Sequence, residues 1–136
     1  MLTGGCLCEQ VRYEYAGLIG PSSYCHCSDC RRVTGSAFNV GVRITRAQFT
    51  LTAGQLKTFA KYADSGNELT RHFCPDCGSP IYTSAPRHLG FIYLKAGTVD
   101  DPTLIEPSAE SWVTSKVTWA DIDNDLPGHP RGNTRY

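Results

Sequence analysis

The sequence contains no apolar run long enough to cross a bilayer. No stretch approaches the roughly 20 apolar residues that a membrane span needs, and the first residues do not place an apolar run after a basic segment. Net charge is also lacking, because 13 basic residues balance 13 acidic ones. No global field therefore attracts nucleic acid or an anionic membrane, so we expect a soluble, cytoplasmic protein whose partners are small molecules.

Long amphipathic helical patterns, internal repeats and low-complexity linkers are absent as well. Short runs of alternating or β-branched and aromatic residues indicate strands instead. They are Val11–Tyr15, Phe38–Val42, Leu69–Phe73 and, most clearly, Gly90–Gly97. We predict a mostly β fold with one or two short helices, formed by a single domain over residues 1–127. Residues 128–136, in a polar and turn-rich stretch, are expected to form a loose tail.

The seven cysteines are an odd number and lie in short spacings. In a reducing compartment this pattern indicates metal binding rather than disulfides. A secreted disulfide scaffold is the alternative, and the lack of a signal-like segment disfavours it.

Three cysteines fall within the segment Cys25–Arg32. Residues two apart in an extended segment face the same way, so Cys25 and Cys27 can approach one ion, and Cys30 can turn back toward it. Ser28 is predicted to cap a short helix that ends at Gly35, which places Cys30 in the first turn, where a thiolate is favoured. Three ligands and one open position are the pattern of catalytic zinc. A purely structural zinc knuckle stays an alternative, as does a fourth ligand from His26, although alternation directs that side chain away.

The other four cysteines form a C-x-C pair, Cys6 and Cys8, and a C-x-x-C pair, Cys74 and Cys77. Together they predict a closed four-sulfur structural zinc site, with Gly78 allowing the tight turn. Closing the loop from Cys8 to Cys74 costs roughly 4 kcal/mol, whereas structural zinc binding yields on the order of 10 kcal/mol or more. We therefore expect a zinc-stapled β-sheet domain. A redox dithiol is the alternative, but it would require a strand–helix context.

Other side chains near the three-cysteine segment are candidates for substrate contacts. Arg31 and Arg32 are suited to bind carboxylates. Gly35 and Ser36 expose backbone amides that could hold an anion, although turn formation explains them equally well. Trp112 and Trp119 are predicted to lie in the core, with a place in the wall of the site as the alternative.

These motifs resemble the glutathione-dependent formaldehyde-activating enzyme family, which also includes centromere protein V. The resemblance rests on Gly5–Cys8, Cys25–Arg32 with Gly35 and Phe38, and Phe73–Gly78, and it runs from about Thr3 to Pro127. It implies a β-tent fold with a structural zinc on Cys6, Cys8, Cys74 and Cys77 and a catalytic zinc on Cys25, Cys27 and Cys30. It also implies carbon–sulfur lyase chemistry, in which glutathione adds to formaldehyde to give S-hydroxymethylglutathione, and the reverse. The chain departs from the family pattern at Glu9, where a glycine usually follows the second cysteine.

The residues and the resemblance together support a zinc-dependent enzyme with glutathione, or a similar thiol, as co-substrate of a small carbonyl. Zinc at the open position would lower the pKa of the thiol or polarise the carbonyl oxygen. A zinc-dependent interaction module with two structural metals is the alternative. A methionine sulfoxide reductase would need a nucleophilic cysteine late in the chain, and no cysteine follows Cys77. Nucleic-acid binding is disfavoured by the absence of a basic stripe.

Overall fold

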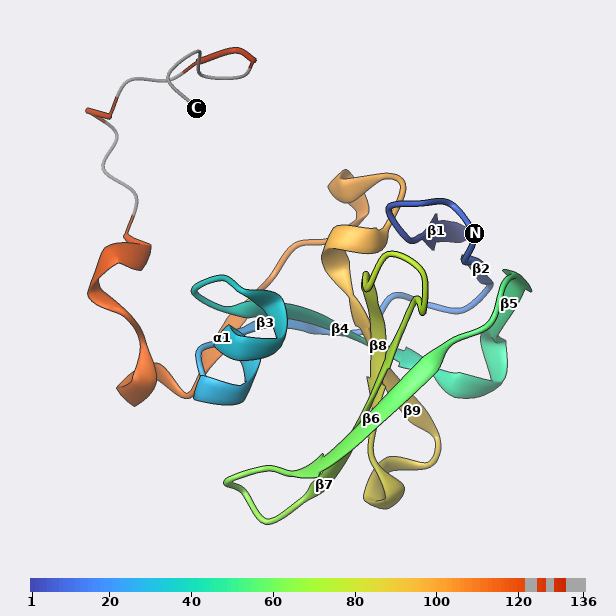
Figure 1. The fold of residues 1–136 in the computed structure, drawn as a ribbon, viewed down its shortest axis with the longest axis horizontal. Coiled ribbons are helices and arrows are strands. Elements are labelled where there is room, and N and C mark those ends of the chain that lie inside the picture. The colour runs from blue at the N-terminus through green and yellow to red at the C-terminus, as the bar shows by residue number, and fades with distance from the viewer. Residues whose placement is uncertain (122–124, 127–128, 132–136) are drawn as a thin grey trace.

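The computed structural model describes residues 1–121, 125–126 and 129–131, and these form two β-sheets (Figure 1). The predicted mostly β class is confirmed. The predicted tail at residues 128–136 lies largely outside the described residues.

The smaller sheet has three strands in the order β1-β2-β5, and the larger has seven in the order β10-β3-β4-β9-β8-β7-β6. The strands of the smaller sheet are β1 (Leu2–Gly5), β2 (Arg12–Tyr15) and β5 (Phe49–Ala53). Those of the larger are β3 (Ser22–Cys25), β4 (Asn39–Thr45), β6 (Lys57–Tyr62), β7 (Glu68–Phe73), β8 (Pro80–Ser84), β9 (Phe91–Lys95) and β10 (Ala109–Ser111). The helix α1 spans Ser28–Thr34. Short 3-10 turns are η1 (Arg46–Gln48), η2 (Pro86–His88), η3 (Ala96–Thr98), η4 (Pro102–Leu104), η5 (Val113–Ser115) and η6 (Thr118–Ala120).

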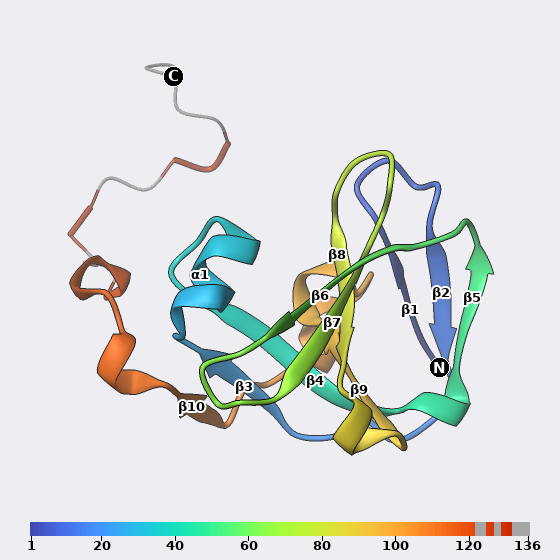
Figure 2. The same cartoon turned by 60° about the horizontal axis from the view of Figure 1, so that its bottom comes forward.

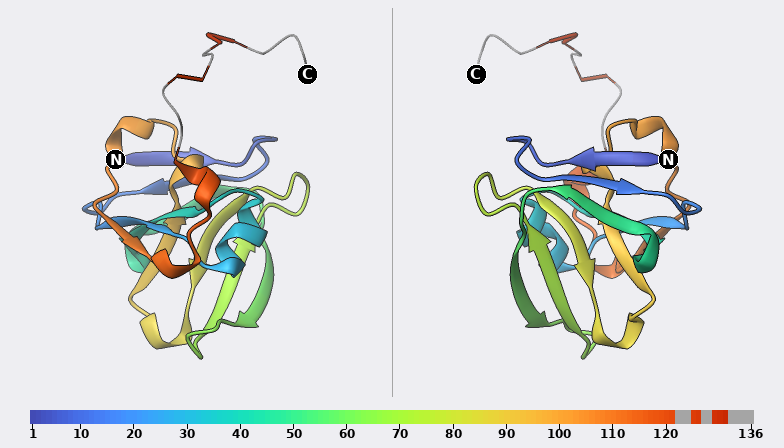
Figure 3. Two further views of the ribbon diagram at one scale, coloured as in Figure 1. Left: turned by 90° about the vertical axis from the view of Figure 1, so that its left-hand side faces the viewer. Right: turned by 90° about the vertical axis from the view of Figure 1, so that its right-hand side faces the viewer.

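Neighbouring strands pair antiparallel, except that β10 runs parallel to β3. Figure 2 shows α1 beside β3 and β4, at the opposite end of the molecule from β1, β2 and β5. In Figure 3, β1 and β2 lie on one side of the molecule and the strands from β6 to β9 on the other. The cysteines that follow β1 and those at the junction of β3 and α1 therefore belong to different parts of the folded molecule.

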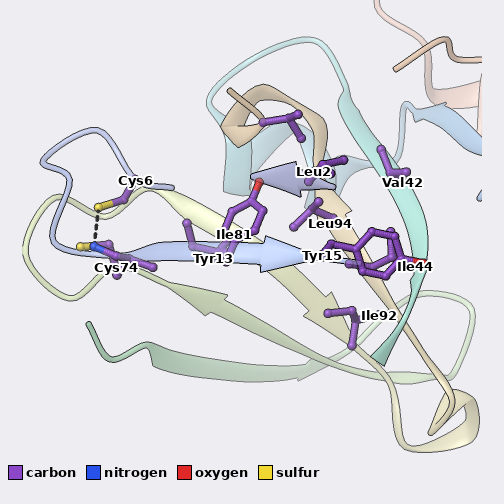
Figure 4. Packing of buried hydrophobic residues seen from close by; sticks show 12 residues of the cluster. Leu2, Cys6, Tyr13, Tyr15, Val42, Ile44, Cys74, Ile81, Ile92 and Leu94 are labelled. Carbon is purple, nitrogen blue, oxygen red and sulfur yellow. Dashed lines mark hydrogen bonds between the residues drawn. The ribbon is translucent and has the colours of Figure 1, made fainter. Parts of the chain in front are cut away.

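The core forms where the two sheets face each other (Figure 4). Side chains two residues apart on one strand point the same way, so Tyr13 and Tyr15 of β2 are both buried, as are Ile92 and Leu94 of β9. Val42, Ile44 and Ile81 complete the contact from β4 and β8. Cys6 and Cys74 lie at one end of this cluster, so the first cysteine group borders the core.

The predicted helix is present, but its N-terminal cap differs from the expectation. Cys27, not Ser28, occupies the cap position, and its sulfur accepts a hydrogen bond from the backbone N–H of Cys30 at 3.3 Å. Gly35 ends the helix in the left-handed conformation, as predicted, with φ +63°. A cysteine sulfur therefore serves both as helix cap and as a member of the sulfur cluster.

The prediction that Trp112 and Trp119 lie in the core is wrong, because their side chains are 44% and 68% exposed. Both follow β10, which adds to the edge of the larger sheet rather than between the sheets. Among the residues that the structure describes, no helix combines the length and apolarity that crossing a bilayer requires.

Candidate metal centre and active site

The first sulfur cluster is built from two loops that the core brings together. Cys6 and Cys8 follow β1, whereas Cys74 and Cys77 lie in the turn between β7 and β8. Their four Sγ atoms lie within 4.8 Å of one another, with Cys6 and Cys8 3.6 Å apart and Cys8 and Cys74 3.8 Å apart. A tetrahedral zinc with Zn–S bonds of about 2.3 Å separates its sulfurs by about 3.8 Å. The donor set and its spacing therefore fit a zinc ion.

Backbone conformation and hydrogen bonds hold these loops in shape. Gly78 has φ +77°, as its predicted role in the tight turn requires, and its N–H donates to the Cys74 carbonyl at 2.9 Å. Glu9 also has a positive φ, +67°. A Cβ is disfavoured in this left-handed region, so the backbone at this position suits glycine better than glutamate. The N–H of Leu7 donates to the Ser79 hydroxyl at 3.0 Å and ties the two loops together.

Polar groups in the same loops favour thiolates. The Val11 N–H donates to the sulfur of Cys6 at 3.2 Å. The Ser79 hydroxyl lies 3.2 Å from the sulfur of Cys77 and, with the Ser79 N–H, lowers the pKa of Cys77 to about 5. Since a metal binds the deprotonated sulfur, these hydrogen bonds prepare the cluster for a cation.

The second sulfur cluster is formed by Cys25, Cys27 and Cys30 at the junction of β3 and α1. Their sulfurs also lie within 4.8 Å of one another, and all three side chains are partly buried. The hydrogen bond from the Cys30 thiol lowers the pKa of Cys25 to about 5, whereas the same interaction raises that of Cys30. The cluster thus offers three sulfurs to one ion, one fewer than a closed structural zinc site uses.

His26 is not part of this sulfur cluster, in agreement with the predicted alternation. Its side chain is buried, and its Nε2 lies 3.0 Å from a carboxylate oxygen of Glu110 on β10. The imidazole also contacts the ring of Phe38 edge-on. This histidine connects β10 to the end of β3 instead of completing a ligand set.

A cavity of about 510 Å³ opens beside Cys25 and Cys30. Its walls come mainly from β3, β4, β7, β8 and β9, and among the described residues that line it there is no Asp or Glu. Four cationic side chains line it: Arg43, Arg71, Arg87 and Lys95. The cavity therefore has a positive character that the neutral chain as a whole lacks.

Arg71 and Lys95 are the buried members of this group, each only 8% exposed. Lys95 donates to Asn39 Oδ1 at 2.8 Å, and within the part of the chain that the structure describes neither cation forms an ion pair with a carboxylate. Burial lowers the pKa of Lys95, while the nearby sulfurs act in the opposite direction. Buried cations without a carboxylate partner favour an anion in the adjoining space.

The residues that sequence reasoning proposed for substrate contacts lie elsewhere. Arg32 lines another cavity, of about 290 Å³, beside Asp29 and Phe59, and this cavity shares only Arg71 with the large one. The Nε of Arg31 is buried without a hydrogen-bond partner. Gly35 and Ser36 are exposed, and the Ser36 N–H donates to the Thr34 hydroxyl at 3.2 Å.

None of these four residues lines the cavity beside Cys25 and Cys30. Sequence reasoning missed Arg71 and Lys95, whose only signal was a charge within or at the end of a predicted strand.

The sequence and the fold resemble those of known proteins. The pattern of the glutathione-dependent formaldehyde-activating enzyme family matches residues 1–115, a span that contains all seven cysteines. The chain belongs to this family. The resemblance that the cysteine motifs indicated is thereby confirmed, and the matched span also includes Arg71, Lys95 and Trp112.

Two further proteins resemble this family member. A curated protein of Halomonas elongata, described as a "Putative glutathione-dependent formaldehyde-activating enzyme", is 25% identical over 133 residues, covering 91% of this chain and 82% of its own. A crystal structure of a Rhodobacter sphaeroides protein superposes with a TM-score of 0.63 at 17% identity, covering 80% of this chain and 99% of that one. The second likeness shows a shared fold.

Proposed function

We propose that this protein is a zinc-dependent carbon–sulfur lyase, similar to an S-(hydroxymethyl)glutathione synthase. It would add glutathione, or a similar thiol, to formaldehyde or another small carbonyl, and cleave the adduct in reverse. Family membership and the description of the Halomonas relative support these substrates. The observation that carries the proposal is the three-sulfur cluster beside a cationic cavity.

Both sulfur clusters fit zinc, so two ions per chain are proposed, a structural one on Cys6, Cys8, Cys74 and Cys77 and a catalytic one on Cys25, Cys27 and Cys30. Bound at the three-sulfur cluster, zinc would supply Lewis acidity that lowers the pKa of a thiol or polarises a carbonyl. All seven cysteines are free, which agrees with a proposed location in the cytoplasm, where thiols stay reduced.

The charges around the cluster favour an anionic co-substrate. Three thiolates and a divalent cation sum to one negative charge, whereas the buried Arg71 and Lys95 supply two positive charges. The difference leaves the site attractive to a thiolate or a carboxylate. Exposed Arg43 and Arg87 add positive charge where they line the same cavity, and glutathione carries two carboxylates.

The addition involves no net oxidation or reduction. The sulfur pair forms the new S–C bond, the C=O π pair moves to oxygen, and that oxygen takes up a proton equivalent to the one lost by the thiol. Arg71 and Lys95 line the cavity, and their positive charges would stabilise the negative charge that first lies on sulfur and then on oxygen.

The test replaces the two buried cations, as Arg71→Gln and Lys95→Met, and measures glutathione binding by calorimetry. Loss of a charged hydrogen bond costs about 1.5–3 kcal/mol, so each variant should bind glutathione roughly 10- to 100-fold more weakly. The double variant Arg31→Gln/Arg32→Gln is the matched control, since neither residue lines the cavity. It should keep the affinity of the wild type, and all variants should keep their zinc content.

A wild-type protein that binds two zinc ions but no glutathione would overturn the proposed enzyme. That result would favour an interaction module with two structural metals. If only the Arg31→Gln/Arg32→Gln variant bound glutathione more weakly, the carboxylates of glutathione would contact α1 instead of Arg71 and Lys95.

A further inference from the structure

A second, smaller cavity also opens on the three-sulfur cluster. Its volume is about 110 Å³, and all three cysteines line it, whereas only Cys25 and Cys30 line the larger cavity. Besides Cys25 and Cys30, the two cavities share Ser65, Leu69 and Arg71. The other walls of the smaller cavity are Asp29, Ala63 and Asp64 of the β6–β7 turn, and Trp112. The sulfurs thus face one large cationic space and one small space bounded by an indole.

Trp112 is held beside the sulfurs by β10. Ser111 pairs with Cys25 in the parallel β10–β3 register, and the Ser111 carbonyl accepts a hydrogen bond from the His26 N–H at 3.0 Å. On the other side, the Trp112 carbonyl accepts a hydrogen bond from the Ser115 N–H at 3.0 Å. The residue after Ser111 is therefore carried to the end of the strand that supplies Cys25.

The conformation of Trp112 is costly. Its φ of +57° and ψ of +41° place a bulky aromatic residue in the left-handed region, which costs on the order of 1–3 kcal/mol. The side chain nevertheless stays 44% exposed, so this conformation does not place the indole in the core. Strained residues of this kind cluster at active sites and ligand-binding positions.

The size of the smaller cavity restricts what it can admit. An apolar protein cavity of about 150 Å³ admits benzene, and one water occupies about 30 Å³ in the liquid. A space of about 110 Å³ is smaller than that cavity and therefore favours a carbonyl of a few heavy atoms over one that carries an aromatic ring.

We propose that the smaller cavity binds the carbonyl substrate and that Trp112 sets the upper limit on its size, while the larger cavity binds the anionic thiol. This inference rests on the proposed function, which it deepens by dividing the two substrates between two spaces. Trp112 is then the residue that selects formaldehyde-sized electrophiles over larger aldehydes.

The test removes the indole and compares two aldehydes. Trp112→Gly is the informative variant, because glycine accepts a positive φ without strain and the backbone has no reason to move. The zinc-loaded protein is mixed with glutathione and either formaldehyde or benzaldehyde, and exchange NMR reports the catalysed rate of adduct formation. The ratio of kcat/KM for benzaldehyde to that for formaldehyde should rise at least 10-fold.

Trp119→Gly is the matched control, since Trp119 lies on the same segment but lines none of the cavities beside the sulfurs. It should leave the aldehyde ratio unchanged. Trp112→Phe should fall between the wild type and Trp112→Gly.

A fluorescence measurement tests the placement of the indole without turnover. In Trp119→Phe only Trp112 emits, and cobalt loaded in place of zinc should quench that emission. Adding Cys27→Ser should remove most of this quenching. In Trp112→Phe, the remaining Trp119 emission should be insensitive to Cys27→Ser.

The outcomes separate the two proposals. Catalysis of formaldehyde addition by the wild type with an unchanged aldehyde ratio in Trp112→Gly overturns the size limit and leaves the proposed function standing. No catalysis with either aldehyde overturns both. Equal quenching of Trp112 with and without Cys27 places the indole away from the sulfurs and overturns the size limit on its own.

Discussion

Replacing both Cys6 and Cys8 with serine would test whether the four-sulfur site joins the two sheets. At the buried Cys6, serine preserves an acceptor for the Val11 N–H, and the side chain of Cys8 is exposed, so any loss of packing is confined to the Cys6 position. The double variant removes every ligand from the first loop, which prevents the remaining cysteines from keeping the link. What it removes is the closure of a loop whose ends, Cys8 and Cys74, lie 66 positions apart.

The chain-entropy relation converts that loop into about 4 kcal/mol of unfolding free energy. A loss of this size corresponds to a fall in Tm on the order of 10 °C for a domain of this length. The assay is urea unfolding at a fixed concentration of free zinc, combined with zinc content per chain. We expect the double variant to bind one zinc instead of two and to lose at least this much stability.

Cys27→Ser is the control at the second cluster. Its ligands span only Cys25 to Cys30, so the same relation gives about 2 kcal/mol or less. It should also lower the zinc content from two to one, but it should stay folded and lose glutathione binding. The reasoning would be refuted if the Cys6/Cys8 variant unfolded at the same urea concentration as Cys27→Ser, or if it retained both metals.

Three further predictions concern single residues. Glu9→Gly should raise the unfolding free energy by about 0.5–1 kcal/mol in urea titrations, because it relieves the left-handed φ of +67°, whereas Glu9→Ala should give no gain. Gly35→Ala should lower it by about 1 kcal/mol through backbone strain alone, since a Cβ there meets no atom within 4 Å; a loss near zero would contradict the helix end. Burial raises the pKa of Tyr13 to about 12, so as the pH rises the unfolded chain loses this proton before the folded chain does. The unfolding free energy should therefore fall between about pH 10 and 12, by up to roughly 3 kcal/mol. Tyr13→Phe should lack that part of the alkaline loss; equal losses in both proteins would show that Tyr13 ionises normally.

The sulfur clusters could be anticipated from sequence because their signals are local. Cys25 and Cys27 share a face by alternation, and the turn at Gly78 requires a residue free to adopt positive φ. Sequence also predicted the short helix after Cys27. It did not predict that Cys27 itself caps the helix, because cap preferences favour the neighbouring serine and carry no information about a sulfur turned toward a metal site.

The rest of the site depends on contacts between distant segments. Arg71 and Lys95 face one cavity only because β7 and β9 both border β8, and nothing in either local sequence specifies that order. Hydrophobicity alone predicts a core position for Trp112. Its observed position follows from the parallel pairing of β10 with β3. The three residues of β10 carry no recognisable strand pattern, so the sequence does not predict this pairing.

The two clusters contain the same chemical group, yet their place in the chain gives them different physical roles. Ligands of the first cluster come from loops far apart in sequence and border the core, so a bound metal restricts the unfolded chain and stabilises the fold. Ligands of the second come from one short segment, so a metal there adds little to chain topology. Its surroundings differ as well, since buried cations without carboxylate partners in the described chain are destabilising unless an anion joins them. The second cluster thus contributes little to stability, and its surroundings carry positive charge that no carboxylate in the described chain neutralises. Binding an anionic ligand accounts for both properties. Removing Arg71 should therefore weaken glutathione binding while leaving the fold and the metals in place.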